Sequence, residues 1–152
     1  MTYSDALWGL PDPDTHQDFY ADIPLKRFGA WVIDLLVIFA ICVLILPFTA
    51  FIGLFFFWAL WLGVGLIYRI WCMSARSATL GMRLMSIEFR NARGERFDSG
   101  TACLHTLLYT LMMSTLILQA ISVIAILVTS RRQGLHDLLL GTAAVNRSAL
   151  LR

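Results

Sequence analysis

The feature that most constrains this chain is a run of 34 residues, from 35 to 68, that contains no Asp, Glu, Lys or Arg. A helix needs only about 20 apolar residues to cross a bilayer, so the run is long enough for two crossings. Pro47 divides it into segments of about residues 28–46 and 50–68. Because an unpaired backbone group is costly in hydrocarbon, both segments are predicted to be helices. The sequence therefore predicts a tight transmembrane helical hairpin with a connection of about residues 47–49.

A second uncharged run covers 32 residues, from Ser99 to Ser130. Its apolar part, about residues 102–129, is long for one crossing helix and short for two. A single crossing would place Arg131 and Arg132 on the outer side, whereas a segment that turns back would keep every basic stretch on one side. Gln119 is a candidate for the bend or for an interhelical hydrogen bond. The sequence leaves both alternatives open.

Composition separates this chain from soluble and nucleic-acid-binding proteins. It is 59% hydrophobic and 14% charged, whereas soluble domains are about 25% charged. A net charge of +2 is too small to indicate nucleic-acid binding. The three cysteines lie about thirty residues apart, a spacing that suggests neither a disulfide framework nor a zinc site. We expect no metal and no cofactor.

The charges are distributed unevenly along the chain. Five acidic residues precede the first base, and ten of the twelve bases follow residue 68. The positive-inside rule assigns the N terminus and the arginine-rich loop of residues 69–100 to the cytoplasm. Within that loop, residues 84–90 alternate as a strand would and a turn-like Asn91-Ala-Arg-Gly94 follows, which predicts a short β-hairpin. The loop is also a candidate contact for anionic lipid.

Three short motifs resemble those of a known family. Arg27 and Asp34 lie in RFGAWVID at the start of the first apolar segment, and Asp137 lies in RRQGLHDLLLGTAAV near the C terminus. Between them, SATLGMR at residues 77–83 is similar to a T-x-G-K-R motif, with Met82 where lysine is usual. In these motifs and their order the chain resembles the RDD family of small bacterial membrane proteins, over roughly residues 25–146. The resemblance implies a location in the bacterial inner (cytoplasmic) membrane and a role in transport.

Asp34 is the most demanding residue of the first segment. It lies two helical turns past Arg27, about 10 Å along the axis, so the two are not an ordinary i,i+4 pair. A carboxylate this deep costs roughly 2.5 to 3.5 kcal/mol on insertion scales unless it is neutral, paired or hydrated. Asp34 is therefore expected to pair with an arginine from another segment, and the candidates are Arg83, Arg131 and Arg132.

Asp137 poses the same problem near the other end of the chain. It lies among leucines on a predicted short interfacial helix that ends at Gly141. Arg27 is its expected partner, and His136 is a further candidate member of this polar cluster. One interpretation is a structural clamp that fixes helix packing; the other is an ion or proton site in which Asp34 or Asp137 titrates.

Two further features bear on packing and chemistry. Gly63 and Gly65, in a segment otherwise rich in large residues, are predicted to mark a close approach of two helices. His16, His105 and His136 are scattered along the sequence, and His105 is expected to be a hydrogen-bonded packing residue. No enzymatic site is expected.

These inferences predict an all-α integral membrane protein with a short β-hairpin in its cytoplasmic loop. Its parts would be an acidic cytoplasmic tail (1–25), an RDD-like membrane domain (26–146) and a short C-terminal tail (147–152). A chain of 152 residues can hardly enclose a gated path by itself. We therefore expect an accessory or assembly-type component that packs against a larger membrane partner; the alternative is a small ion- or proton-coupled transporter that acts as a homo-oligomer.

Overall fold

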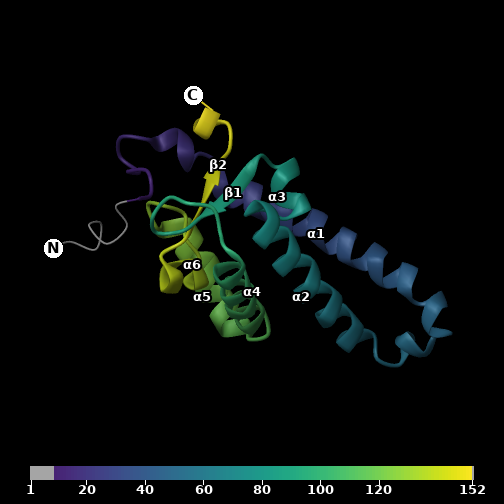
Figure 1. The fold of residues 1–152 in the computed structure, drawn as a ribbon. Coiled ribbons are helices and arrows are strands. Elements are labelled where there is room, and N and C mark those ends of the chain that lie inside the picture. Colours follow the sequence, from purple (N-terminus) through teal and green to yellow (C-terminus); the bar gives the residue numbers. More distant parts are fainter. Residues whose placement is uncertain (1–8, 152) are drawn as a thin grey trace.

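The computed structural model describes residues 9–151; residues 1–8 of the predicted acidic tail lie outside the described residues, as does Arg152. Two long helices, α1 (Ile23–Ile45) and α2 (Phe57–Arg76), form an antiparallel hairpin that projects from the rest of the chain (Figure 1). Each is long and apolar enough to cross a membrane. The predicted helical hairpin is thus present, and the protein is mostly helical.

The connection of the hairpin is longer than predicted. It runs from residue 46 to 56 and contains two 3₁₀ turns, Pro47–Thr49 and Ile52–Leu54. Between them Ala50 and Phe51 both adopt left-handed conformations, with φ of 47° and 62°. An α-helix cannot pass through such residues, so α2 begins at Phe57 and not near residue 50. The prediction of a three-residue turn was therefore wrong.

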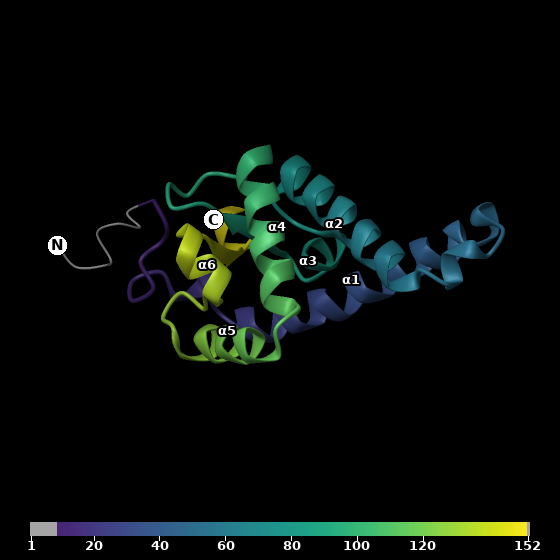
Figure 2. The ribbon, with the colours of Figure 1, turned by 90° about the horizontal axis from the view of Figure 1, so that it is seen from below.

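The third apolar segment is a bent pair of helices, α4 (Ser99–Met113) and α5 (Leu116–Val128). The two helices differ in direction by 116° at a break of two residues, Ser114 and Thr115. α5 therefore leaves the end of α4 at a steep angle and packs against α4 and α6 (Figure 2). Gln119 lies inside α5, one turn past the break, so it does not mark the bend.

A small antiparallel sheet joins the loop to the C-terminal segment. Its strands are β1 (Ile87–Arg90) and β2 (Ala143–Asn146), with Ile87 opposite Asn146 and Arg90 opposite Ala143. The predicted β-hairpin was wrong, although its first strand is present. Residues 91–95 do turn, but the chain then leaves the sheet, and the amide of Phe97 donates to the Ser77 hydroxyl at 2.6 Å. The buried residues of β2, mostly small, take the place beside β1.

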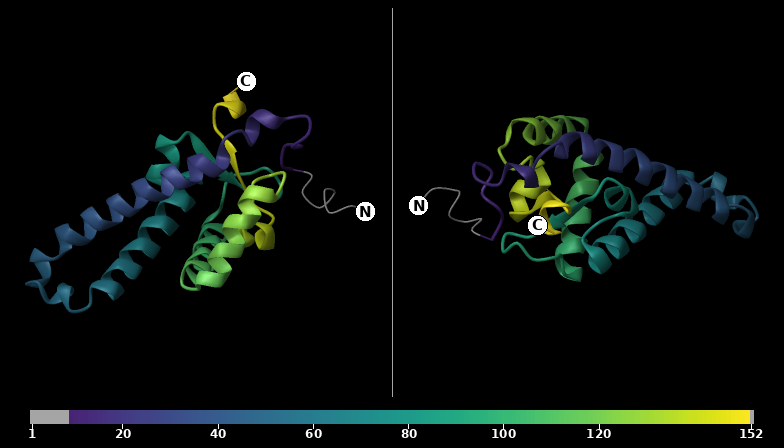
Figure 3. Two further views of the ribbon diagram at one scale, coloured as in Figure 1. Left: turned by 180° about the vertical axis from the view of Figure 1, so that it is seen from behind. Right: turned by 90° about the horizontal axis from the view of Figure 1, so that it is seen from above.

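The main core lies at one end of the hairpin, where two short helices, α3 (Leu80–Leu84) and α6 (Leu135–Leu140), also pack (Figure 3). Its buried residues come from α1, α2, β1, α4, β2 and the segments around α3, and include Ile23, Met73, Met82, Phe89 and Ala102. The outer half of the hairpin is different. There α1 and α2 pack mainly on each other, through Ile38, Cys42 and partly buried neighbours. Large side chains such as Phe55 and Trp58 are exposed there, by 86% and 84%.

Neither glycine of α2 marks a close helix contact within this chain. A Cβ added at Gly63 would meet no atom within 4 Å, and one at Gly65 would meet only Ile38, at 3.8 Å. The close approach is at Gly81 in α3, where an added Cβ would lie 2.2 Å from the carbonyl oxygen of Ala30. Within this chain the tightest packing onto α1 therefore comes from α3 and not from α2, and a close approach of another molecule at Gly63 or Gly65 stays a prediction.

The turned-back α5 predicts that both described ends of the chain lie on the same side of the membrane. In a background with Cys42, Cys72 and Cys103 replaced by alanine, cysteines would be introduced at the exposed positions Ser99, Ser148 and Phe48. An impermeant thiol reagent should label Ser99→Cys and Ser148→Cys from one side and Phe48→Cys from the other. Labelling of Ser148→Cys together with Phe48→Cys would contradict the turned-back arrangement.

Candidate functional site

Asp137 on α6 is the centre of a buried polar cluster. Its side chain is 0% exposed. One oxygen, Oδ2, accepts from Arg27 Nη1 at 2.6 Å and from the Gly134 amide at 2.9 Å. The other, Oδ1, lies 2.8 Å from His105 Nε2 and 3.3 Å from the Thr142 hydroxyl. The carboxylate therefore joins α1, α4 and both ends of α6.

The charge of Asp137 is stabilised by its neighbours. Burial raises the pKa of Asp137, but the Arg27 guanidinium, His136 and His105 outweigh burial and hold this pKa well below its usual range. An ionised carboxylate only accepts hydrogen bonds, so His105 must carry a proton on the nitrogen that faces it. The pairing of Asp137 with Arg27 is the one that the sequence predicted.

His105 and His136 are far apart in the sequence but adjacent in the fold. Their ring centroids are 4.8 Å apart at an interplanar angle of 80°, and Phe89, Phe97 and Tyr109 pack around them. Burial lowers the pKa of His136 to about 4; Asp137 opposes this shift, whereas His105 and Arg27 reinforce it. His136 is therefore neutral at pH 7. The two histidines meet because α4 and α6 pack against each other. His105 is 3% exposed and hydrogen-bonded to Asp137, as expected of a packing residue.

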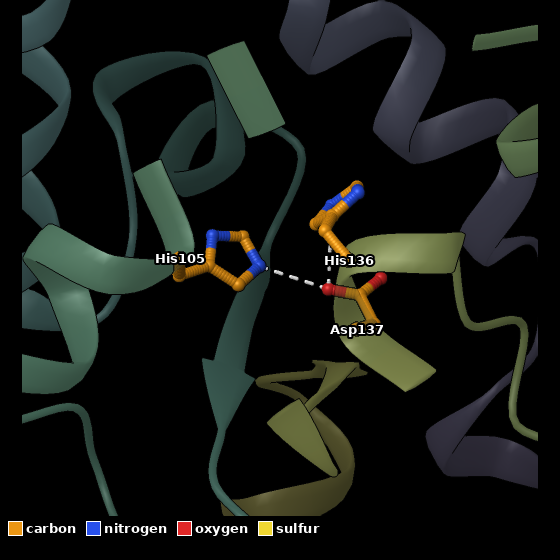
Figure 4. A group of neighbouring side chains, drawn as sticks. All are labelled: His105, His136 and Asp137. Carbon is orange, nitrogen blue, oxygen red and sulfur yellow. Dashed lines mark hydrogen bonds and ion pairs between the residues drawn. The ribbon is translucent and has the colours of Figure 1, made fainter. Parts of the chain in front are cut away.

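His105, His136 and Asp137 also form a group that could ligate a metal ion (Figure 4). One ligand atom from each lies within 4.8 Å of the others, with His105 on α4 and the other two on α6. Two imidazoles and a carboxylate suit a first-row transition metal. However, Arg27 already places its guanidinium here, 2.6 Å from Asp137 Oδ2 and 3.4 Å from His136 Nε2. A metal would have to displace this fixed positive charge.

Asp34 on α1 is the centre of a second cluster, and the structure corrects its predicted pairing. Its side chain accepts from three uncharged donors: the Tyr68 hydroxyl at 2.6 Å, the Thr79 hydroxyl at 2.7 Å and the Gly81 amide at 2.9 Å. Asp34 is 2% exposed. These donors come from α2, from the residue that caps α3 and from α3 itself. Among the described residues, no arginine forms an ion pair with Asp34.

The three arginines predicted for Asp34 lie elsewhere. Arg131 interacts with the Tyr20 hydroxyl, and Arg132 donates to the Leu127 carbonyl. Arg83 is half-buried and forms no ion pair with any residue from 9 to 151. Hydroxyl and amide donors satisfy a carboxylate without bringing a second charge out of water, which is why the arginines are not required.

A cavity of about 70 Å³ lies between the two clusters. Arg27, His105 and His136 line one part of it, and Asp34 and Thr79 line another. Two polar atoms on lining residues, Thr106 Oγ1 and His136 Nδ1, have no hydrogen-bonding partner among the described residues. A space of this size holds a few water molecules or one small polar group, either of which would satisfy such atoms.

Residues 23–141 match the family model described as the RDD family. The chain belongs to the RDD family. The match contains both polar clusters except Thr142, and with the two apolar helices it indicates a membrane protein. No curated protein and no solved structure matches this RDD chain.

Several cluster residues of this RDD protein carried no clear signal in the sequence. Tyr68 ends the 34-residue uncharged run with nothing to distinguish it from the other aromatic residues there, yet it is 9% exposed and its hydroxyl donates to Asp34. Thr142 follows the helix-ending Gly141 and reaches Asp137 only because α6 stops there. Thr79 and Gly81 did lie in the family-like motif SATLGMR, so that motif was the available signal.

Removing one member of the Arg27–Asp137 pair should be strongly destabilising. Arg27→Met leaves the Asp137 carboxylate buried without its counter-charge, a change that typically costs about 3 to 5 kcal/mol. The double variant Arg27→Met with Asp137→Leu should recover only part of this loss, since His105 and the Gly134 amide would then lack an acceptor. Unfolding by a denaturing detergent in mixed micelles measures both, with the exposed Arg76→Met as control. A single variant as stable as that control would contradict the clamp.

Stability should also fall between pH 6.5 and pH 4. The pKa of His136 is about 4 in the folded protein and about 6.5 in an unfolded chain. Its neutral form therefore contributes stability above pH 6.5, and this contribution is lost as the pH falls towards 4. His136→Phe, which keeps a ring but cannot titrate, should flatten the loss in thermal unfolding curves. An unchanged pH dependence in this variant would show that other groups cause it.

Proposed function

We propose that this RDD protein is an accessory or assembly-type component of the bacterial inner membrane that packs against a larger membrane partner. Its N terminus and the loop of residues 69–100 would lie in the cytoplasm, where the positive-inside rule assigns them. The observation that carries the proposal is that the carboxylates at the centres of the two clusters, Asp34 and Asp137, are already occupied by donors of the same chain. Asp34 has three such donors and Asp137 has four within 3.3 Å.

Occupied carboxylates favour a structural clamp over a transport site. A carboxylate offers about four acceptor positions, so little is left for a passing cation. Release of Asp137 would also strand Arg27 in the protein interior, which is costly. The clusters instead hold α3, α4 and α6 against α1 and α2, and so fix the shape of the cytoplasmic end.

The outer half of the hairpin supports the need for a partner. Beyond Ile38 and Cys42, α1 and α2 contact little besides each other, and the bent pair α4–α5 does not cover them (Figure 1). Apolar side chains there, including Phe48, Phe55 and Trp58, suit lipid or the apolar face of another membrane protein.

A second candidate is the small ion- or proton-coupled transporter that acts as a homo-oligomer. One observation favours it: the cavity between the clusters is lined by Asp34, His105 and His136, which are groups that can carry protons. Because a single chain of this size can hardly enclose a gated path by itself, several copies would be needed.

The composition of the complex separates the two functions. We expect protein extracted in mild detergent to have the mass of a hetero-complex, with this chain bound to a larger membrane protein. A homo-oligomer without other subunits would favour the transporter.

Reconstitution provides the matching functional test. Liposomes that contain the purified chain and a trapped pH indicator should respond to imposed Na⁺ or K⁺ gradients no more than empty liposomes do. A response that Asp34→Asn abolishes, in protein shown to remain folded, would overturn the accessory role.

A further inference from the structure

The polar cavity is the meeting point of two larger apolar grooves. The first groove, of about 430 Å³, lies between α1, α2 and α4, and the second, of about 510 Å³, lies between α1 and α5. Trp31 and Tyr109 line both grooves and also the cavity. The three hollows therefore lie next to one another and share these two side chains as walls.

Each groove meets the cavity beside an arginine. Arg69 lines the cavity and the first groove, and Arg27 lines the cavity and the second. Away from the arginines the linings are mainly apolar, with Thr110 and Ser114 in the first groove and Gln119, Ser122 and His136 in the second. The first groove includes Leu35, Trp61 and Leu66, and the second includes Phe28, Val123 and Ile126.

The two arginines differ in charge balance. Arg27 is neutralised by Asp137, whereas Arg69 forms no ion pair with any residue of the described chain. Its guanidinium carbon lies 4.4 Å from the centroid of the Tyr109 ring, so the side chain is held in place without being neutralised. Asp34 also lines the cavity, but its carboxylate is engaged by Tyr68, Thr79 and Gly81. The cavity thus retains a positive group that lacks an anion.

The cavity also retains polar atoms without partners. Thr106 is 2% exposed and His136 is 4% exposed. The buried atoms Thr106 Oγ1 and His136 Nδ1 have no hydrogen-bonding partner among the described residues. A buried polar atom without a partner is costly. His136 Nδ1 lies beside Gly134, which does not line the cavity, so the argument rests on Thr106, a cavity-lining residue whose hydroxyl has no partner among the described residues. This hydroxyl is a second observation, independent of Arg69, that points to a ligand.

We propose that this site binds one anionic phospholipid with two acyl chains. The phosphate lies in the cavity beside Arg69 and Thr106, and one acyl chain occupies each groove. For the first groove depth agrees with this placement, because Arg69 directly follows the 34-residue uncharged run and the groove extends from Arg69 along that run to Trp58. The paired apolar grooves favour a lipid over free phosphate, which would fill only the cavity. The site goes beyond the accessory role and does not depend on it.

Native mass spectrometry of the purified full chain, titrated with lipid in detergent, tests the proposal. We expect the chain to retain one phosphatidylglycerol and to release phosphatidylcholine, whose net charge is zero. Arg69→Gln should lower the affinity for phosphatidylglycerol about tenfold or more, as expected for loss of a charged hydrogen bond. Arg76→Gln removes the same charge from an exposed position of the same helix and should leave the affinity unchanged.

A groove variant keeps the test decisive if Arg69→Gln disturbs Tyr109. Gly65 lines the first groove, and a Cβ added there would meet only Ile38, at 3.8 Å, so Gly65→Leu should fill the groove and lower retention. Gly63 does not line the groove, and Gly63→Leu should retain the lipid as the native chain does. Single-chain lysophosphatidylglycerol should bind more weakly than the two-chain lipid.

Each alternative outcome contradicts the lipid site in a distinct way. Displacement of phosphatidylglycerol by inorganic phosphate would assign the cavity to free phosphate. Equal retention of phosphatidylcholine would show that the grooves bind lipid without regard to charge. Equal affinity in the native chain, Arg69→Gln and Gly65→Leu would show that the bound lipid lies elsewhere.

Discussion

A carboxylate that is buried beside apolar helices has to be stabilised by groups of its own chain, and two such carboxylates organise this RDD protein. Asp137 of α6 binds Arg27 of α1 and His105 of α4. Asp34 draws Tyr68 of α2 and the start of α3 onto α1. Helix α1 carries a member of each cluster, Arg27 and Asp34, about 10 Å apart along its axis. It is therefore the element to which α2, α3 and α6 are tied directly, and α4 through Asp137.

The two clusters use different electrostatics. Asp137 faces a guanidinium, and its charge is balanced inside the protein at the cost of desolvating both groups. Asp34 is surrounded by hydroxyl and amide donors and brings no second charge with it. Arg27 forms its ion pair within the first cluster, and no arginine among the described residues pairs with Asp34 in the second. Arg69 therefore lines the cavity without forming an ion pair with a carboxylate of residues 9–151. The polar end can thus hold its shape and still offer a positive group to a ligand.

Because one carboxylate pairs with a charged group and the other with uncharged donors, only the first pairing could be predicted from the sequence. Arg27 and Asp137 were paired correctly, because a buried charge calls for an opposite charge and few were available. Asp34 was assigned to an arginine by the same reasoning and wrongly, since its donors are uncharged and come from three segments up to 47 positions away. The predicted strand at residues 84–90 is largely present as β1, but alternation does not reveal that its partner is β2.

Hydrophobicity and charge distribution by themselves determined that the chain has two long apolar helices, a third apolar segment and polar ends. These properties follow from the surrounding solvent. Apolar side chains avoid water, and backbone groups in hydrocarbon must form hydrogen bonds within their own helix, whichever segments lie next to it. The tertiary structure decided where the third segment bends, which strand completes the sheet, and that His105 and His136 meet around Asp137. Those features depend on which segments lie side by side, and contacts between residues distant in the sequence leave no local pattern from which to read them.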